Sequence, residues 1–209
     1  MKLPLLLLAL TCAALSAGCS GDDTLPAPKT LTADGTFTHD ASGMKFPSSV
    51  GRFLRGEINQ YDASGKDVSA GYNLLDRSCP TAATVYVSDG GRVVSFGSSD
   101  EVIDKTRELL FDNAFEGVKA AVVEANPGAE LVSEGDVELG QAGRLYAGKK
   151  ATFRYEREFA GERRQVQSDA FLFPYGQWHI KYRFTYPAEM NAGEEIGAFM
   201  RALRWTLED

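Results

Sequence analysis

Cysteine and histidine are scarce in this sequence. Its 209 residues include only three cysteines and two histidines. Cys12 and Cys19 belong to the N-terminal segment, so Cys79 stands alone in the rest of the chain and no intramolecular disulfide is expected there. A zinc site would need further ligands close to His39 or His179. We therefore predict neither a metal centre nor a disulfide framework.

Sequence motifs of common enzymes are also missing. The chain has no Gly-x-Ser-x-Gly and no His-Glu-x-x-His sequence. Residues 143–150 match most of a phosphate-binding loop, but Lys150 stands where a Mg²⁺-binding Ser or Thr is required. Residues 62–67 have oxygen ligands spaced loosely like a calcium loop, but Lys66 interrupts them. We predict turns at both places and identify no catalytic residue and no cofactor.

Positive charge is in deficit. The chain has 22 Lys and Arg against 29 Asp and Glu, a net charge of −7, which argues against nucleic acid as a partner. Hydrophobic residues make up 44% and charged residues 24%, values that exclude a disordered tail and a polytopic membrane protein. A chain of this length can bury a proper core.

The N-terminus has the parts of a secretory signal. Lys2 is positive, residues 3–15 are apolar apart from Pro4 and Thr11, and residues 16–18 are small. The apolar run is too short, and too quickly followed by polar residues, to be a comfortable membrane span.

Residues 15–19, Leu-Ser-Ala-Gly-Cys, resemble the lipobox of bacterial lipoproteins, although Ser16 replaces the commonest Leu. The resemblance implies cleavage before Cys19 and a diacylglycerol on its sulfur, which anchors the mature chain in a membrane. Ser20 follows the cysteine, which is similar to the outer-membrane sorting pattern of bacteria with two membranes. The implied location is the cell envelope, on the outer membrane and facing the periplasm. The alternative is an ordinary cleaved signal that leaves Cys19 as a free thiol.

The mature chain is predicted to have two parts. Residues 19–37 carry proline, glycine and polar residues with little to bury, so we expect a lipidated flexible tether after the signal peptide at 1–18. Because no later linker or internal repeat occurs, residues 38–209 are predicted to form one globular domain.

Strand patterns dominate that domain. Residues 178–186 alternate between aromatic or aliphatic and polar side chains, which is typical of an antiparallel strand with one buried face. Similar patterns, bounded by turn residues, predict further strands at 52–61, 67–75, 81–87, 92–96, 131–139, 145–159 and 163–173.

Two segments have helical periodicity. Phe111, Phe115, Val118 and Val122 form one apolar stripe in a helix predicted over 100–125, with a capping box from Ser98 to Glu101. A second stripe predicts a C-terminal helix that begins near a capping box at Asn191 and Glu194 and docks on the aromatic face of 178–186; its members are Ile196, Phe199, Met200, Leu203 and Leu207.

The order of elements predicts an α+β fold, with an antiparallel β-sheet and two packed α-helices. This order resembles the PsbP-like fold, named for a luminal protein of photosystem II. The residues that carry the resemblance are Lys45-Phe46-Pro47 and the run 181–187 before a final helix that ends at 203–205. The resemblance spans about Lys45 to Leu207 and implies a fold rather than an activity.

One strand face is a candidate polar binding surface. His179, Lys181 and Arg183 share the polar side of the last predicted strand and could hold an anionic ligand or partner. Residues 154–158 carry one arginine and two glutamates at alternate positions. If the two strands share a sheet, their charges could instead pair and leave a solvated, neutralised face.

The function predicted from these features is a lipid-anchored, non-catalytic binding or accessory module of the cell envelope. Its expected partners are the membrane, through acylated Cys19, and an envelope protein; neither nucleic acid nor nucleotide is expected. One alternative is an envelope hydrolase that uses carboxylates. The other is a periplasmic small-ligand binder with a pocket built from the 12 Phe, eight Tyr and two Trp residues.

Overall fold

The computed structural model describes residues 27–76, 78–91, 93, 97 and 99–205. The predicted signal peptide at 1–18, the predicted lipidation site Cys19 and most of the predicted strand 92–96 lie outside the described residues.

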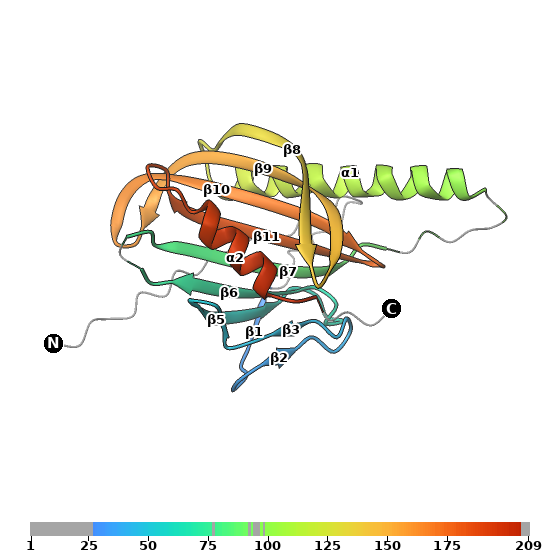
Figure 1. Ribbon diagram of the computed structural model, residues 1–209, viewed down its shortest axis with the longest axis horizontal. Helices are drawn as coiled ribbons and strands as arrows, with labels where there is room; N and C mark the ends of the chain where they lie inside the picture. Colours follow the sequence, from blue (N-terminus) through green and yellow to red (C-terminus); the bar gives the residue numbers. More distant parts are fainter. Residues whose placement is uncertain (1–26, 77, 92, 94–96, 98, 206–209) are drawn as a thin grey trace.

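A large antiparallel sheet forms the body of the protein (Figure 1). Its nine strands include β4 (Ser49–Val50), which pairs with β5 beside the main path. Along that path the order is β1 (Lys29–Leu31), β5 (Phe53–Gln60), β6 (Val68–Leu74), β7 (Thr81–Asp89), β11 (Trp178–Pro187), β10 (Glu162–Tyr175), β9 (Arg144–Phe159) and β8 (Glu130–Gln141). A separate two-stranded sheet joins β2 (Phe37–Thr38) and β3 (Lys45–Phe46).

β11 lies in the middle of this sheet. It pairs with β10 on one side and β7 on the other, so the last strand of the chain fills the gap between two sets of hairpins. Its alternate residues from Trp178 to Tyr186 are all buried, as the period-two pattern predicted.

Helix α2 (Gly193–Ala202) covers the aromatic face of β11, which confirms the predicted docking. The Phe199 ring lies 4.8 Å from that of Phe53 and 5.2 Å from that of Tyr72, between centroids. The end of the helix is tied to β8 because Gln141 Nε2 donates to the carbonyl oxygens of Met200 and Leu203.

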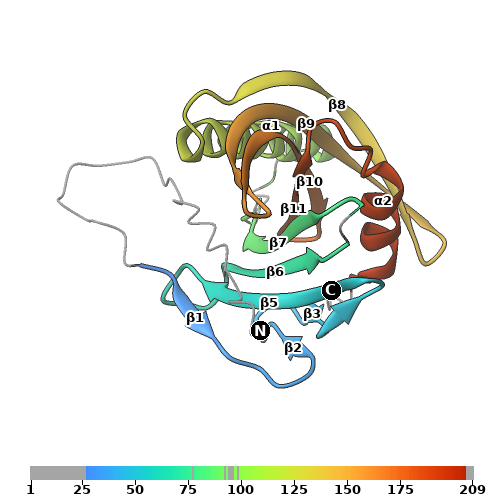
Figure 2. The same ribbon diagram turned by 90° about the vertical axis from the view of Figure 1, so that its left-hand side faces the viewer.

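Helix α1 (Asp100–Ala125) lies on the other face, over β9 and β10, with the predicted bounds (Figures 1 and 2). Phe115 and Val122 are its only residues that are fully buried. Its first half leaves Val102, Leu109 and Leu110 exposed. Ser99 and Ala192 occupy the N-cap positions, and neither makes a side-chain cap. Asn191, the predicted cap of α2, lies one residue earlier and accepts a hydrogen bond from the Gly193 amide, whereas Ser98 lies outside the described residues.

The predicted α+β class is wrong. Strands account for 49% of the described residues and helices for 21%, and the helices pack weakly on the sheet, so the fold is mainly antiparallel β. The reason is that most of the packing and hydrogen bonding comes from strand pairing, whereas α1 buries only two of its 26 side chains.

The predicted tether also needs correction. Residues 29–31 form β1, which pairs in register with the end of β5 at the sheet edge. Residues 29–31 of the segment 19–37 are therefore part of the large sheet, and its residues up to 26 lie outside the described part.

Candidate functional site

The three predicted polar residues of β11 share the face on which α1 lies. His179, Lys181 and Arg183 are two positions apart, so their side chains project to the same side of the sheet. They do not form an open surface, because Arg183 is only 4% exposed and the other two are half-buried.

Arg183 joins three strands through hydroxyl groups. Its Nη2 donates to the Tyr155 hydroxyl on β9 at 3.0 Å, and its Nε donates to Ser168 Oγ on β10 at 3.2 Å. Burial acts to raise the pKa of Tyr155, but the positive charge of Arg183 and the hydrogen bonds of Ser168 and Arg183 together outweigh it, and the pKa is lowered. The Arg183 guanidinium therefore links β11 to β9 and β10 by hydrogen bonds on the face covered by α1.

Lys181 lies against an aromatic ring and near the half-buried carboxyl of Asp67. Its Nζ is 3.8 Å from the centroid of the Tyr86 ring, a close cation–π contact. Burial raises the pKa of nearby Asp67 to about 6, although the charge of Lys181 acts in the opposite direction. A carboxyl that titrates near neutrality beside an ammonium is an uncommon setting and marks this place as a candidate site.

His179 is wedged between the sheet and α1. Its ring centroid lies 5.8 Å from that of Phe111 on α1, in an edge-on arrangement. A Cβ at Gly90 would come within 2.9 Å of the imidazole, so the turn after β7 needs glycine there. Burial lowers the pKa of His179, which keeps the ring neutral at neutral pH and weakens it as an anion ligand.

The charge pairing predicted between β9 and β11 is not made. In the register of β9, β10 and β11, Arg183 shares its face with Ala151 and Tyr155, whereas Glu156 and Glu158 point to the opposite face. Glu156 binds Arg163 instead, at 2.9 Å.

A groove runs beside this cluster, between α1 and the β8–β9 hairpin. Its volume is about 590 Å³. Its walls carry four carboxylates and one ammonium around a floor of small and apolar residues; the lining comprises Glu108, Phe111, Asp112, Asp136, Val137, Glu138, Ala147, Gly148, Lys149 and Pro174. Phe111 lines the groove and also contacts His179, so the groove adjoins the β11 residues.

Lys149 partly neutralises the groove. Its Nζ donates to Asp112 Oδ1 at 2.5 Å. This bond, together with the charges of Asp136 and Glu108, raises the pKa of Lys149. The lining therefore keeps an excess of negative charge with its only cation already bound.

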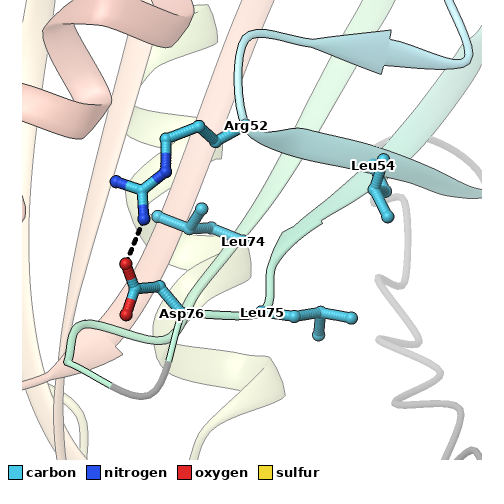
Figure 3. Close-up of a pocket in the computed structure, with 5 residues that line it drawn as sticks. All are labelled: Arg52, Leu54, Leu74, Leu75 and Asp76. Atoms are coloured by element: carbon cyan, nitrogen blue, oxygen red, sulfur yellow. Dashed lines mark hydrogen bonds and ion pairs between the residues drawn. The ribbon is translucent and has the colours of Figure 1, made fainter.

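A second hollow, of about 510 Å³, lies at the other end of the sheet (Figure 3). Leu54, Leu74 and Leu75 line it, together with the ion pair between Arg52 and Asp76. Arg52 also binds Glu195 of α2 at 2.7 Å, so its guanidinium is used to hold the helix to the sheet.

The other histidine, the free cysteine and the loop that loosely matches a calcium site lie among structural contacts. His39 is buried, with its ring nitrogens 2.6 Å from Ser42 Oγ and 2.6 Å from the Gly65 carbonyl oxygen. Cys79 is a half-buried free thiol between β6 and β7. Asp62 accepts a hydrogen bond from the Asp67 amide at 2.9 Å, as in a hairpin turn.

Two further findings concern the described part of the chain. No group of three or more His, Cys, Asp or Glu side chains in it is arranged to hold a metal ion. None of its helices combines the length and the apolar character needed to cross a membrane.

Comparisons with known proteins identify no family. No family model matches the chain, and no curated protein matches it. A solved structure of a Pseudomonas aeruginosa protein of unknown function, PA94, is similar over 66% of this chain and 85% of that one. The identity is 14% and the TM-score 0.34, too low for any inference.

Sequence reasoning missed the groove and Asp67. The groove joins residues of α1 to residues of β8 and β9, which are distant in sequence. One signal was present, since the segment 130–141 contains four acidic residues and no basic residue.

Proposed function

We propose that the protein is a lipid-anchored, non-catalytic binding or accessory module of the bacterial cell envelope. The lipobox at residues 15–19 supports the anchor, and Ser20 supports placement on the outer membrane, facing the periplasm. The groove between α1 and the β8–β9 hairpin carries the binding role, because its wide opening and excess of carboxylates suit a partner of opposite charge.

The polar residues of β11 support this role indirectly. Arg183 is bonded to Tyr155 and Ser168, and Lys181 lies on Tyr86, so these cations stabilise the sheet below the groove. We assign them to the scaffold rather than to an anion-binding surface.

Two experiments test the proposal. Cys19→Ser should release the protein from the membrane fraction into the periplasm; a variant that still floats with lipid would refute the anchor. A photo-crosslinking residue in place of Glu138, in the groove, should give one discrete product in intact cells. The same residue in place of Asp34, exposed near the β1 edge, serves as the control and should give none.

An envelope hydrolase remains the second candidate, because Asp67 has the raised pKa that general acids use. The hydrolase hypothesis predicts that the purified protein releases soluble fragments from isolated cell walls and that Asp67→Asn abolishes the release. Equal release by the wild type and Asp67→Asn would remove Asp67 from that role.

A further inference from the structure

β8 is the last strand of the large sheet and has one strand partner, β9 (Figures 1 and 2). Within the described residues, no strand pairs with its outer edge. Every residue from Glu130 to Asp136 is exposed, whereas Gln141 at the other end is buried and bonded to α2. A long edge of this kind presents alternate backbone N–H and C=O groups to another chain.

The charges of β8 select the partner. Its four charged residues are all acidic, at 130, 134, 136 and 138. Lys119 of α1 binds Glu134 at 2.5 Å and is shared with Glu116. Within the described part of the chain, the other three acidic residues of β8 form no ion pair. Pairing of β8 with a second copy of itself would bring carboxylates together, and like charges across strands are destabilising. A segment rich in lysine or arginine would gain from the same arrangement.

The groove adds further carboxylates on one face of the sheet, the face on which α1 lies. Asp136 and Glu138 project to the side of the sheet where Glu108 and Asp112 of α1 face them. A basic side chain on an added strand would lie opposite Asp136 or Glu138, about 5 Å away between Cβ atoms, within reach of the groove.

We propose that β8 is a docking edge for an extended, basic segment of a partner protein, which adds to the sheet as one further strand. This inference rests on the proposed role as a binding module and names the chemistry of the partner. Backbone hydrogen bonds would supply affinity, and the carboxylates of β8 and the groove would supply the preference for lysine and arginine.

Three synthetic peptides as long as residues 130–138 test the proposal on the full mature chain in a nonionic detergent. In the first, lysine alternates with threonine or valine; in the second, glutamate replaces lysine; the third is the lysine peptide with a central proline. Fluorescence anisotropy should show the lysine peptide binding at least about tenfold more tightly than the other two, since proline removes a ladder hydrogen bond. Hydrogen exchange should slow in 130–138 and not in β1.

Charge reversal provides the second arm. Asp136→Lys combined with Glu138→Lys should weaken the lysine peptide about tenfold or more and favour the glutamate peptide. The matched control, Asp34→Lys with Glu158→Lys, makes the same charge change at exposed positions outside the groove and β8, and should bind like the wild type. Asp136→Asn with Glu138→Gln, which adds no new charge, should give an intermediate loss and replaces the reversal if that variant does not fold.

Two results obtained with a bound peptide would overturn the proposal. Equal binding of the proline peptide would show charge attraction without strand addition, and slowed exchange away from 130–138 would place the peptide elsewhere. Neither result depends on the anchor. If no peptide binds but a discrete cross-link still forms at position 138, strand addition is refuted and the binding role of the groove is not. The Cys19→Ser variant tests the membrane attachment separately.

Discussion

Replacement of Asp67 by Asn should stabilise the protein at neutral pH. Burial raises the pKa of Asp67 from 3.8 to about 6 in the folded state, against the attraction of Lys181. A shift of about two pH units corresponds to about 3 kcal/mol of unfolding free energy. Because the carboxyl is partly exposed and solvent screens its charge, we expect about 1–2 kcal/mol. Asn keeps the shape of the side chain and removes the charge.

The sign follows from proton binding. Between about pH 4 and pH 6 the folded protein holds the Asp67 proton more tightly than the unfolded chain does, so this group lowers stability as the pH rises through that window. Below about pH 4 both states are protonated and the penalty disappears; above about pH 6 it is complete. The gain from Asp67→Asn should therefore be full at pH 7.5 and close to zero at pH 3.5.

Urea denaturation of the wild type and Asp67→Asn at both pH values measures this difference, because other titrating groups are common to the two proteins. Asp34→Asn, at an exposed carboxyl, is the control and should change stability equally little at both values. A loss of stability in Asp67→Asn at pH 7.5 would show that the pairing of Asp67 with Lys181 outweighs burial, and the reasoning would be refuted.

Other predictions concern packing and the β11 cluster. Phe199→Ala should cost about 3–5 kcal/mol in urea denaturation, because the ring is 1% exposed in the α2 core; an unchanged midpoint would mean that α2 is not docked. Arg183→Ala should cost about 2–4 kcal/mol, since the Tyr155 hydroxyl loses its charged donor, and calorimetry would contradict this if the melting temperature stayed within a degree. Gly148→Ala should cost about 1–3 kcal/mol, because the new Cβ would overlap the Phe173 ring and the Leu172 carbonyl oxygen; wild-type stability would show that β9 shifts freely.

Local periodicity was sufficient for most elements of this protein. The spacing of Phe111, Phe115 and Val122 predicted α1 with its observed bounds, and the alternation along 178–186 predicted β11 and the face on which α2 docks. These patterns can be recognised in the sequence because buried side chains recur along a helix or a strand with the period of that backbone. The same alternation placed His179, Lys181 and Arg183 on one face.

The tertiary structure decided what that face does. Whether Arg183 is solvated or buried depends on the strands beside β11, and the register of β9 sends Glu156 away from it to Arg163. The weak packing of α1, the inclusion of residues 29–31 in the sheet and the groove beside β8 likewise depend on pairings between distant segments. A one-residue change of register reverses the face of every side chain in a strand, and no local pattern in one strand specifies the register of its neighbour.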